Sequence, residues 1–214
     1  MQMTLANRIT LVRLGLVPAF MIFMVVDNFW TRLLSLVIFI AASITDWYDG
    51  AIARRTGTVT VVGMFLDPLV DKMLIAAALV GFVELRELHI PAWMVVLIIS
   101  REFLITGLRT LAASRGILMA AERAGKFKMT SQITAIITIL VILCLNSAFE
   151  RWPSIYPGGS EGWPLLLREV MERLPYWLVF WVTLLTVLSG YIYIRKYQDL
   201  LNREFSMLKT NRAE

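Results

Sequence analysis

The 214-residue sequence has one cysteine, one histidine and few charged residues, which make up 17% of the chain. Cys144 has no second cysteine with which to form an internal disulfide bond. Soluble domains normally carry about 25% charged residues, so the composition argues against a soluble domain. The sequence also lacks low-complexity segments and internal repeats. These absences exclude a disulfide scaffold, a disordered chain and a fibrous protein.

Apolar residues take the place of the missing charge. They make up 58% of the chain, and the mean hydropathy is +0.68. The formal net charge of +5 suits either a nucleic acid or an anionic membrane surface as a partner. The basic residues are scattered over predicted loops without an aromatic stacking platform, so we expect no nucleic-acid partner. The high apolarity favours the membrane.

A membrane-spanning helix needs about 20 largely apolar residues. Six segments meet or approach this requirement: Leu5–Val26, Leu33–Ala53, Phe65–Val83, Pro91–Ala113, Ser131–Leu145 and Tyr176–Ile194. The fifth of these helices is expected to extend beyond its apolar segment at both ends. The sequence therefore predicts an all-α fold, an integral membrane bundle of six transmembrane helices over residues 1–194. Residues 195–214 are predicted to form a short amphipathic C-terminal tail, suited to an anionic lipid surface or to a dimer contact. The longest polar stretch, Ala148–Pro175, is predicted to be an extramembrane loop with one short helix over Leu165–Leu174.

The distribution of lysine and arginine predicts the orientation of this bundle. Fourteen of these residues fall on the side that carries both termini, and five fall on the other side. Positive charge accumulates on the cytoplasmic side of membrane proteins, so both termini are predicted to be cytoplasmic. The first apolar run contains Arg8 and Arg13 and has no small-residue cleavage site, so we expect no cleaved signal peptide.

Four of the six aspartates of the chain lie close together, at Asp46, Asp49, Asp67 and Asp71. The first two are three residues apart near the end of the second predicted span. The other two are four apart near the start of the third, and both spacings put a pair on one helix face. Ionised carboxylates in a bilayer are costly and mark functional sites. Oxygen ligands without histidine or cysteine suit Mg²⁺ or Mn²⁺. The alternative is that they are solvated charges at helix ends.

Small and basic residues follow these aspartates. Gly50 and Ala53 share a face with Asp46, where they would let a phosphate approach the helix backbone closely or would simply allow close helix packing. Arg54 adds a guanidinium that can hold a diphosphate through paired hydrogen bonds.

The whole segment reads Asp46-x2-Asp49-Gly50-x2-Ala53-Arg54-x8-Gly63-x3-Asp67-x3-Asp71. At every fixed position it resembles the signature of the CDP-alcohol phosphotransferase family. This resemblance implies a membrane enzyme, usually a homodimer with six transmembrane helices. Such an enzyme uses divalent metal to move a phosphoalcohol or phosphatidyl group from a CDP-linked donor to an alcohol. Here the resemblance implies two ions, either Mg²⁺ or Mn²⁺. The reaction releases CMP.

The resemblance also implies roles for individual residues. Asp46, Asp49 and Asp67 would be the main metal ligands, and Asp71 would be the general base and touch the second metal. The CDP-lipid would be bound by these residues: Asn7, Thr10, Gly50, Ala53, Arg54 and Thr60. For Thr60 an ordinary turn residue is the alternative, and for Asn7 and Thr10 a helix cap is the alternative.

The acceptor alcohol has to be inferred from residues outside the signature. Arg101 and Arg109 lie on the fourth predicted span, and Lys126 and Lys128 lie close to the fifth. Converging cations would suit an acceptor that is itself a phosphate ester. Alternatively, an arginine of the fourth span pairs with the neighbouring Glu102.

Three segments resemble the branch of the family that makes phosphatidylglycerophosphate. They are Ser100-Arg101-Glu102-Phe103 through Gly107-Leu108-Arg109, then Gly125-Lys126-Phe127-Lys128, and Ser189-Gly190-Tyr191. The implied substrates are CDP-diacylglycerol and sn-glycerol 3-phosphate, with Arg101, Arg109 and Lys126 binding the acceptor phosphate. The implied location is the bacterial inner membrane, with a cytoplasmic active site among membrane lipids. Another acceptor such as inositol phosphate or serine, a divalent-cation transporter and a non-catalytic scaffold are the alternatives.

Overall fold

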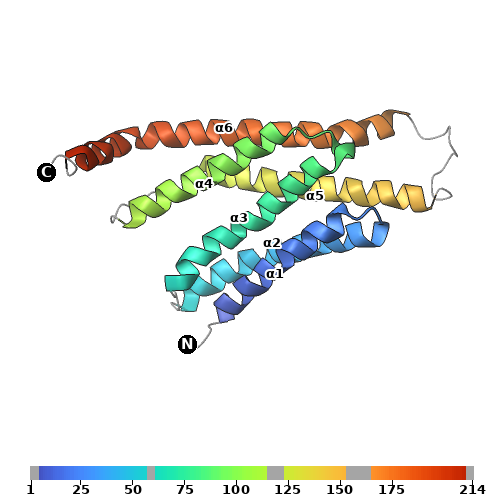
Figure 1. The fold of residues 1–214 in the computed structure, drawn as a ribbon, viewed down its shortest axis with the longest axis horizontal. Coiled ribbons are helices and arrows are strands. Elements are labelled where there is room, and N and C mark those ends of the chain that lie inside the picture. The colour runs from blue at the N-terminus through green and yellow to red at the C-terminus, as the bar shows by residue number, and fades with distance from the viewer. Residues whose placement is uncertain (1–4, 57–60, 115–122, 153–164, 211–214) are drawn as a thin grey trace.

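The computed structural model describes residues 5–56, 61–114, 123–152 and 165–210; for some of these the backbone alone is described. All regular structure within these ranges is helical, in agreement with the predicted fold class (Figure 1). The helices are α1 (Leu5–Val25), α2 (Phe29–Thr56), α3 (Val61–Glu84), α4 (Ala92–Ser114), α5 (Arg123–Arg151) and α6 (Leu165–Thr210). A 3-10 turn, η1 (Arg86–Leu88), joins α3 to α4.

Each of the six predicted apolar segments overlaps one long helix, and α5 and α6 extend well beyond their predicted segments at both ends. Within the described residues, two segments are both long and apolar enough to cross a membrane, Phe127–Arg151 in α5 and Glu169–Gln198 in α6. Val12–Val25 and Phe29–Thr45 are shorter apolar stretches in the same described part of the chain. Six helices are thus observed, while six membrane crossings stay a prediction.

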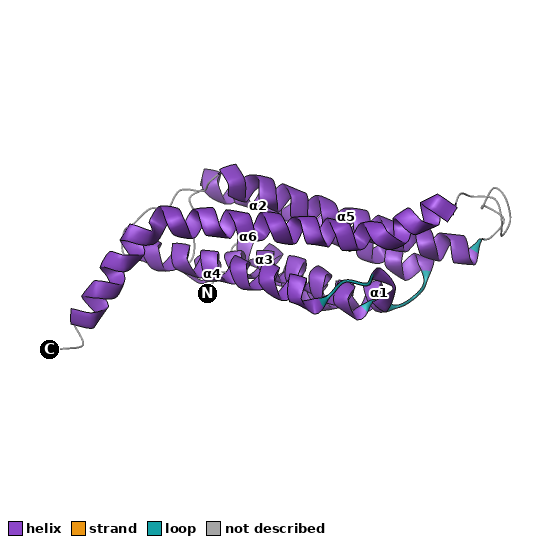
Figure 2. Ribbon diagram, turned by 90° about the horizontal axis from the view of Figure 1, so that it is seen from above, coloured by secondary structure: helices purple, strands orange, loops and turns teal. Residues whose placement is uncertain are grey.

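The structure corrects the prediction of a separate short helix over residues 165–174. These residues form the first turns of α6, which continues through Pro175 to Thr210. Proline removes one backbone donor from a helix, but the packed apolar residues that follow keep the helix continuous. The predicted boundary between residues 194 and 195 also falls inside α6. Figure 2 shows that the C-terminal end of this helix bends away from the bundle.

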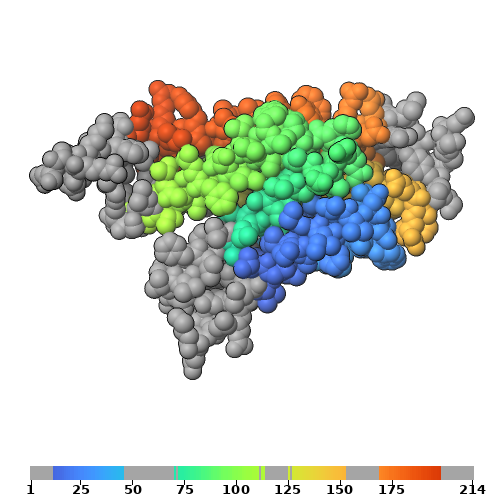
Figure 3. Space-filling view, in the orientation of Figure 1, coloured from blue at the N-terminus to red at the C-terminus, as the bar shows by residue number. Residues whose placement is uncertain are grey.

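The core lies along the middle of the bundle, where large side chains from different helices meet. Phe20 of α1 packs against Phe39 of α2, with ring centroids 5.7 Å apart. Across the bundle, α6, α4, α3 and α1 follow one another over one face (Figure 3). Many large apolar side chains remain exposed on the outside, among them Trp30, Trp93 and Trp181. Apolar surface of this extent is what a lipid environment would cover.

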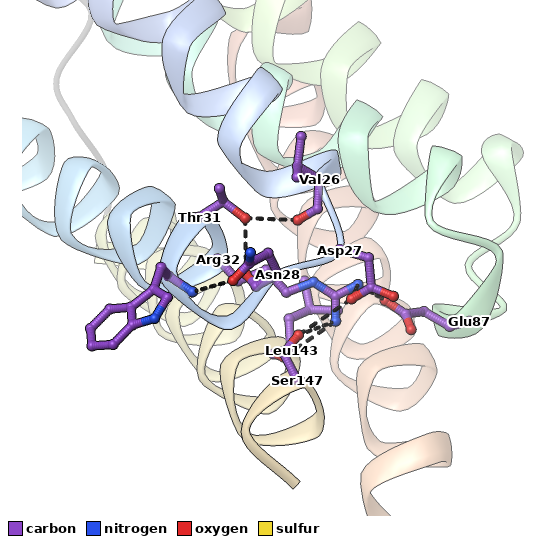
Figure 4. Close-up of polar contacts among 9 residues, drawn as sticks. Val26, Asp27, Asn28, Thr31, Arg32, Glu87, Leu143 and Ser147 are labelled. Atoms are coloured by element: carbon purple, nitrogen blue, oxygen red, sulfur yellow. Dashed lines mark hydrogen bonds and ion pairs between the residues drawn. The ribbon is translucent and has the colours of Figure 1, made fainter. Parts of the chain in front are cut away.

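Polar contacts close the end of the bundle that carries the α1–α2 connection and η1. Arg32 is buried there, and its Nη2 atom is 2.6 Å from the Glu87 Oε1 atom and 3.1 Å from the Asp27 Oδ1 atom. Its Nη1 atom donates to the hydroxyl of Ser147 at 2.9 Å and to the carbonyl oxygen of Leu143 (Figure 4). The arginine thereby ties α2, α5 and the two connections together.

The opposite end carries the residues that the sequence predicts to be functional. The start of α1, the end of α2, the start of α3, the end of α4 and the start of α5 all lie there (Figure 1). The C-terminal half of α6 extends past the same end.

Candidate active site

The four predicted metal ligands lie on helical backbone on either side of one short connection. Asp46 and Asp49 belong to the last turns of α2, and Asp67 and Asp71 belong to the first turns of α3. The predicted spacing on a helix face therefore applies to both pairs. Their side chains lie outside the described part of the structure, so the metal site stays a prediction.

The same holds for most of the predicted CDP-lipid site. Gly50, Ala53 and Arg54 lie on α2, and Asn7 and Thr10 lie on α1, with only their backbone described. Thr60 lies outside the described residues. Lys126, predicted to bind the acceptor phosphate, lies in the first turn of α5, and its side chain is likewise not described.

Four charged side chains from three helices meet at this end of the bundle, and we call them the basic cluster: Lys72, Arg101, Glu102 and Lys128. Glu102 of α4 is its centre. The Glu102 Oε2 atom is 3.0 Å from the Nζ atom of Lys72 on α3. The Glu102 Oε1 atom contacts the Nζ atom of Lys128 on α5 and is 3.4 Å from the Nη1 atom of Arg101. Because Lys72 directly follows Asp71, the basic cluster lies one residue along the chain from the predicted general base.

The basic cluster carries more positive than negative charge in a place with little water. Within the four residues of the cluster, three cations face one carboxylate, a formal excess of two positive charges. The aspartates of the signature, whose side chains are not described, add negative charge to the same end of the bundle. The exposed fraction of the side chain is only 4% for Lys128 and 12% for Glu102. Buried charges are costly unless they are paired. Such an excess therefore suits an anionic ligand, and a phosphate monoester dianion would balance it.

Arg101 is held against α6 by two neighbouring residues. Its Nη2 atom donates a hydrogen bond to the Ser189 hydroxyl at 3.0 Å. A Cβ atom built on Gly190 would lie 3.1 Å from the Arg101 Cγ atom and 3.6 Å from the Nε atom. Glycine at this position therefore lets the arginine side chain lie directly on the α6 backbone. The Arg101 Nε atom is buried and has no hydrogen-bond partner among the described residues.

Arg109 lies two helical turns further along α4 and is exposed. Its guanidinium carbon is 6.0 Å from the centroid of the Tyr193 ring on α6, a cation–π distance. Tyr193 packs with Ile105 and Ala112 where α4 meets α6. Arg101 and Arg109 thus follow the same helix pair, but of the two only Arg101 belongs to the basic cluster.

The sequence offered a partial signal for this arrangement. Pairing of Arg101 with Glu102 was one of the alternatives, and the structure has that contact, although Glu102 also pairs with two lysines. Lys72 was not predicted to take part in the site. A lysine among apolar residues and beside a predicted catalytic aspartate needs a partner, and that rule would have pointed to it. The contact of Ser189 with Arg101 joins segments 88 residues apart and needed the fold.

Comparison with known proteins gives the class of the chain. Residues 3–188 match the sequence model of the family described as CDP-alcohol phosphatidyltransferase. The chain belongs to this family of transferases, as the aspartate signature predicted.

Three bacterial relatives of this chain share one name. A protein of Bacillus subtilis (strain 168) is 45% identical over 181 residues, covering 74% of this chain and 91% of the relative. One from Rickettsia typhi is 29% identical over 191 residues, covering 89% and 95%. One from Sodalis glossinidius is 36% identical over 146 residues, covering 65% and 78%. All three are named CDP-diacylglycerol–glycerol-3-phosphate 3-phosphatidyltransferase.

Proposed function

We propose that this chain transfers the phosphatidyl group of CDP-diacylglycerol to sn-glycerol 3-phosphate, giving phosphatidylglycerophosphate and CMP. The observation that carries the proposal is the basic cluster, a largely buried site with excess positive charge beside the segment that bears the aspartate signature. An acceptor with a phosphate group needs such a site, whereas serine or inositol would need less positive charge. The names of the relatives support the same substrates.

In this proposal the acceptor phosphate binds at the basic cluster through Arg101, Lys128 and Lys72. The Arg101 Nε–H group, which has no partner among the described residues, is available to donate to a phosphate oxygen. Arg109 and Lys126 would extend the positive surface toward the entrance. Charge-assisted hydrogen bonds of this kind are about twice as strong as neutral ones, so they would position the glycerol firmly.

The reaction itself is a substitution at phosphorus. The 1-hydroxyl oxygen of the acceptor forms a bond to the phosphorus that carries diacylglycerol, and the bond from that phosphorus to the CMP oxygen breaks. Asp71 takes the proton of the attacking hydroxyl. Gly50, Ala53 and Arg54 hold the diphosphate of the donor, while Asn7, Thr10 and Thr60 lie near the nucleotide. Asp46, Asp49, Asp67 and Asp71 are a donor set that suits two Mg²⁺ or Mn²⁺ ions, which would stabilise charge on the attacking and leaving oxygens.

We also propose a membrane location, an orientation and an oligomeric state for the enzyme. All six helices cross the bacterial inner membrane, with the basic cluster and both termini on the cytoplasmic side, and two chains form a homodimer. The exposed apolar outer surface supports a lipid environment. At the cytoplasmic boundary a lipid donor, whose acyl chains stay in the bilayer, can meet a water-soluble acceptor.

The test is CMP release by the purified chain in detergent with CDP-diacylglycerol and Mg²⁺. Glycerol 3-phosphate, inositol phosphate, inositol and serine are compared as acceptors, each with and without a chelator. We expect release with glycerol 3-phosphate alone and none after chelation. Release with serine or inositol would contradict the role of the basic cluster in choosing the acceptor. Release with inositol phosphate would contradict glycerol 3-phosphate as the acceptor but not the binding of a phosphate group at the cluster. No release with any acceptor from folded protein would contradict the enzymatic proposal and favour ion transport or a scaffold.

A further inference from the structure

Two neutral polar side chains lie buried beside the basic cluster without a use in the mechanism above. Gln132 of α5 is 2% exposed and Thr186 of α6 is 0% exposed. The Gln132 Nε2 atom and the Thr186 Oγ1 atom have no hydrogen-bond partner among the described residues. Buried polar groups nearly always have partners, because an unpaired one costs free energy. Two such groups near a ligand site therefore point to a polar ligand.

Helical register places both side chains at one depth. Lys128 of α5 and Ser189 of α6 contact the neighbouring residues Glu102 and Arg101, so they mark the same level of the bundle. The chain runs in opposite directions in α5 and α6, which lie side by side (Figures 1 and 2). One turn inward from that level leads to Gln132 along α5. One turn inward along α6 leads to Thr186.

The two residues form the floor of the polar region. The next turn inward carries the core residues Ile136 on α5 and Val182 on α6. Thr183 is also buried in that turn of α6, but its hydroxyl already donates to the Val179 carbonyl oxygen. The side chains of Gln132 and Thr186 carry no charge, unlike those of the basic cluster above them. A neutral group of the ligand is therefore expected at this depth, below an anionic group.

We propose that Gln132 and Thr186 bind the secondary hydroxyl of the phosphorylated acceptor and so determine its selection; this rests on the function proposed above. The phosphate occupies the basic cluster, and the hydroxyl on the adjoining carbon, four bonds from phosphorus, points toward the next helical turn inward, which lies ~5.4 Å deeper. A hydroxyl both donates and accepts hydrogen bonds. The Gln132 amide donates to the hydroxyl oxygen, and the hydroxyl donates to the Thr186 Oγ1 atom. This anchoring leaves the primary hydroxyl free to attack phosphorus.

A purely structural role for these residues predicts different behaviour. Thr186→Val keeps the shape of the side chain and removes an unpaired buried hydroxyl. If Thr186 only fills space, this change leaves the kinetics unaltered and leaves the melting temperature unchanged or higher. Thr183→Val is the matched control. Thr183 is also buried on α6, but its hydroxyl donates to the Val179 carbonyl oxygen at 2.8 Å.

The experiment compares two acceptors in the full chain in detergent, with CDP-diacylglycerol and Mg²⁺. One acceptor is glycerol 3-phosphate, and the other is 3-hydroxypropyl phosphate, which has no secondary hydroxyl. We expect the unmodified chain to prefer glycerol 3-phosphate by about tenfold or more in kcat/KM. Thr186→Val and Gln132→Met should reduce this preference to less than about threefold by lowering kcat/KM for glycerol 3-phosphate alone. Thr183→Val should retain the preference.

The outcomes separate this inference from the proposed function. Folded Thr186→Val and Gln132→Met variants that keep the full preference would overturn the assignment of the hydroxyl. An unmodified chain that uses both acceptors equally would overturn it as well. A chain that turns over neither acceptor would overturn the proposed function and this inference with it. Melting temperatures identify any variant that fails to fold, and the two variants are judged independently.

Discussion

Gly190 offers a direct way to displace Arg101 without removing its charge. In Gly190→Ala the new Cβ atom would lie 3.1 Å from the Arg101 Cγ atom, so the arginine would have to move by a few tenths of an ångström. A shift of the Cγ atom also displaces the guanidinium group, which the Ser189 hydroxyl and Glu102 hold in place. Misplacement by 1 Å can cost about 100-fold in rate. We therefore expect KM for glycerol 3-phosphate to rise about 5- to 10-fold, equivalent to roughly 1 kcal/mol.

Gly107→Ala is the matched control for this prediction. Gly107 lies on α4, the helix that carries Arg101, and a Cβ atom built there meets nothing within 4 Å. Both substitutions raise intrinsic helix propensity by about 1 kcal/mol, so neither should unfold the protein. The assay is initial-rate CMP release over a range of glycerol 3-phosphate concentrations at saturating CDP-diacylglycerol. An unchanged KM in Gly190→Ala, or an equal rise in Gly107→Ala, would refute the reasoning.

Three further predictions follow from the contacts at the two ends of the bundle. Glu102→Gln removes the carboxylate from among three cations, so the unfolding free energy should fall by about 3–5 kcal/mol in thermal unfolding. Adding Lys128→Met should recover part of this loss. Purely additive effects in the double variant would contradict the pairing of Glu102 with Lys128. Arg32→Met breaks the contacts with Glu87, Asp27 and Ser147, and it should lower the unfolding free energy by about 1–3 kcal/mol while KM for glycerol 3-phosphate stays unchanged. A changed KM would contradict a purely structural role for Arg32. Arg86→Met, at an exposed position, is the control. Asp71→Asn should keep the melting temperature and lower turnover by about 10²–10⁴-fold, and near-normal CMP release would exclude Asp71 as the base.

The helices and their approximate limits were accessible from the sequence because long apolar runs have few alternatives. The predicted segment Pro91–Ala113 and the observed α4, Ala92–Ser114, differ by one residue at each end. The helix over residues 165–174 was predicted, but its continuity with the last span was not, because Pro175 indicated a break between them. Local propensity is a weak guide where tertiary packing continues a helix through an unfavourable residue.

Part of the candidate site was also predictable from the sequence, and part of it was not. The signature from Asp46 to Asp71 predicted the family. Both aspartate pairs could also be placed on helices from the sequence alone. The pairing of Glu102 with Lys72 and Lys128 could not be predicted in detail, because it depends on how α3, α4 and α5 pack together. Long flexible side chains reach several possible partners, and only the packed bundle selects among them. Gln132 and Thr186 gave no signal in the sequence, because their burial and their unpaired atoms become visible only in the fold.

The central claim is that the basic cluster and the aspartate segment act together on a phosphorylated acceptor. The most direct measurement is transfer of radiolabelled glycerol 3-phosphate into organic-soluble lipid by the purified chain with CDP-diacylglycerol and Mg²⁺. The account predicts labelled phosphatidylglycerophosphate in equal amount to the CMP released. It also predicts that Arg101→Met, which removes the arginine from the cluster, raises KM for the labelled acceptor at least tenfold. CMP release without labelled lipid, or an Arg101→Met variant with unchanged KM, would contradict the account.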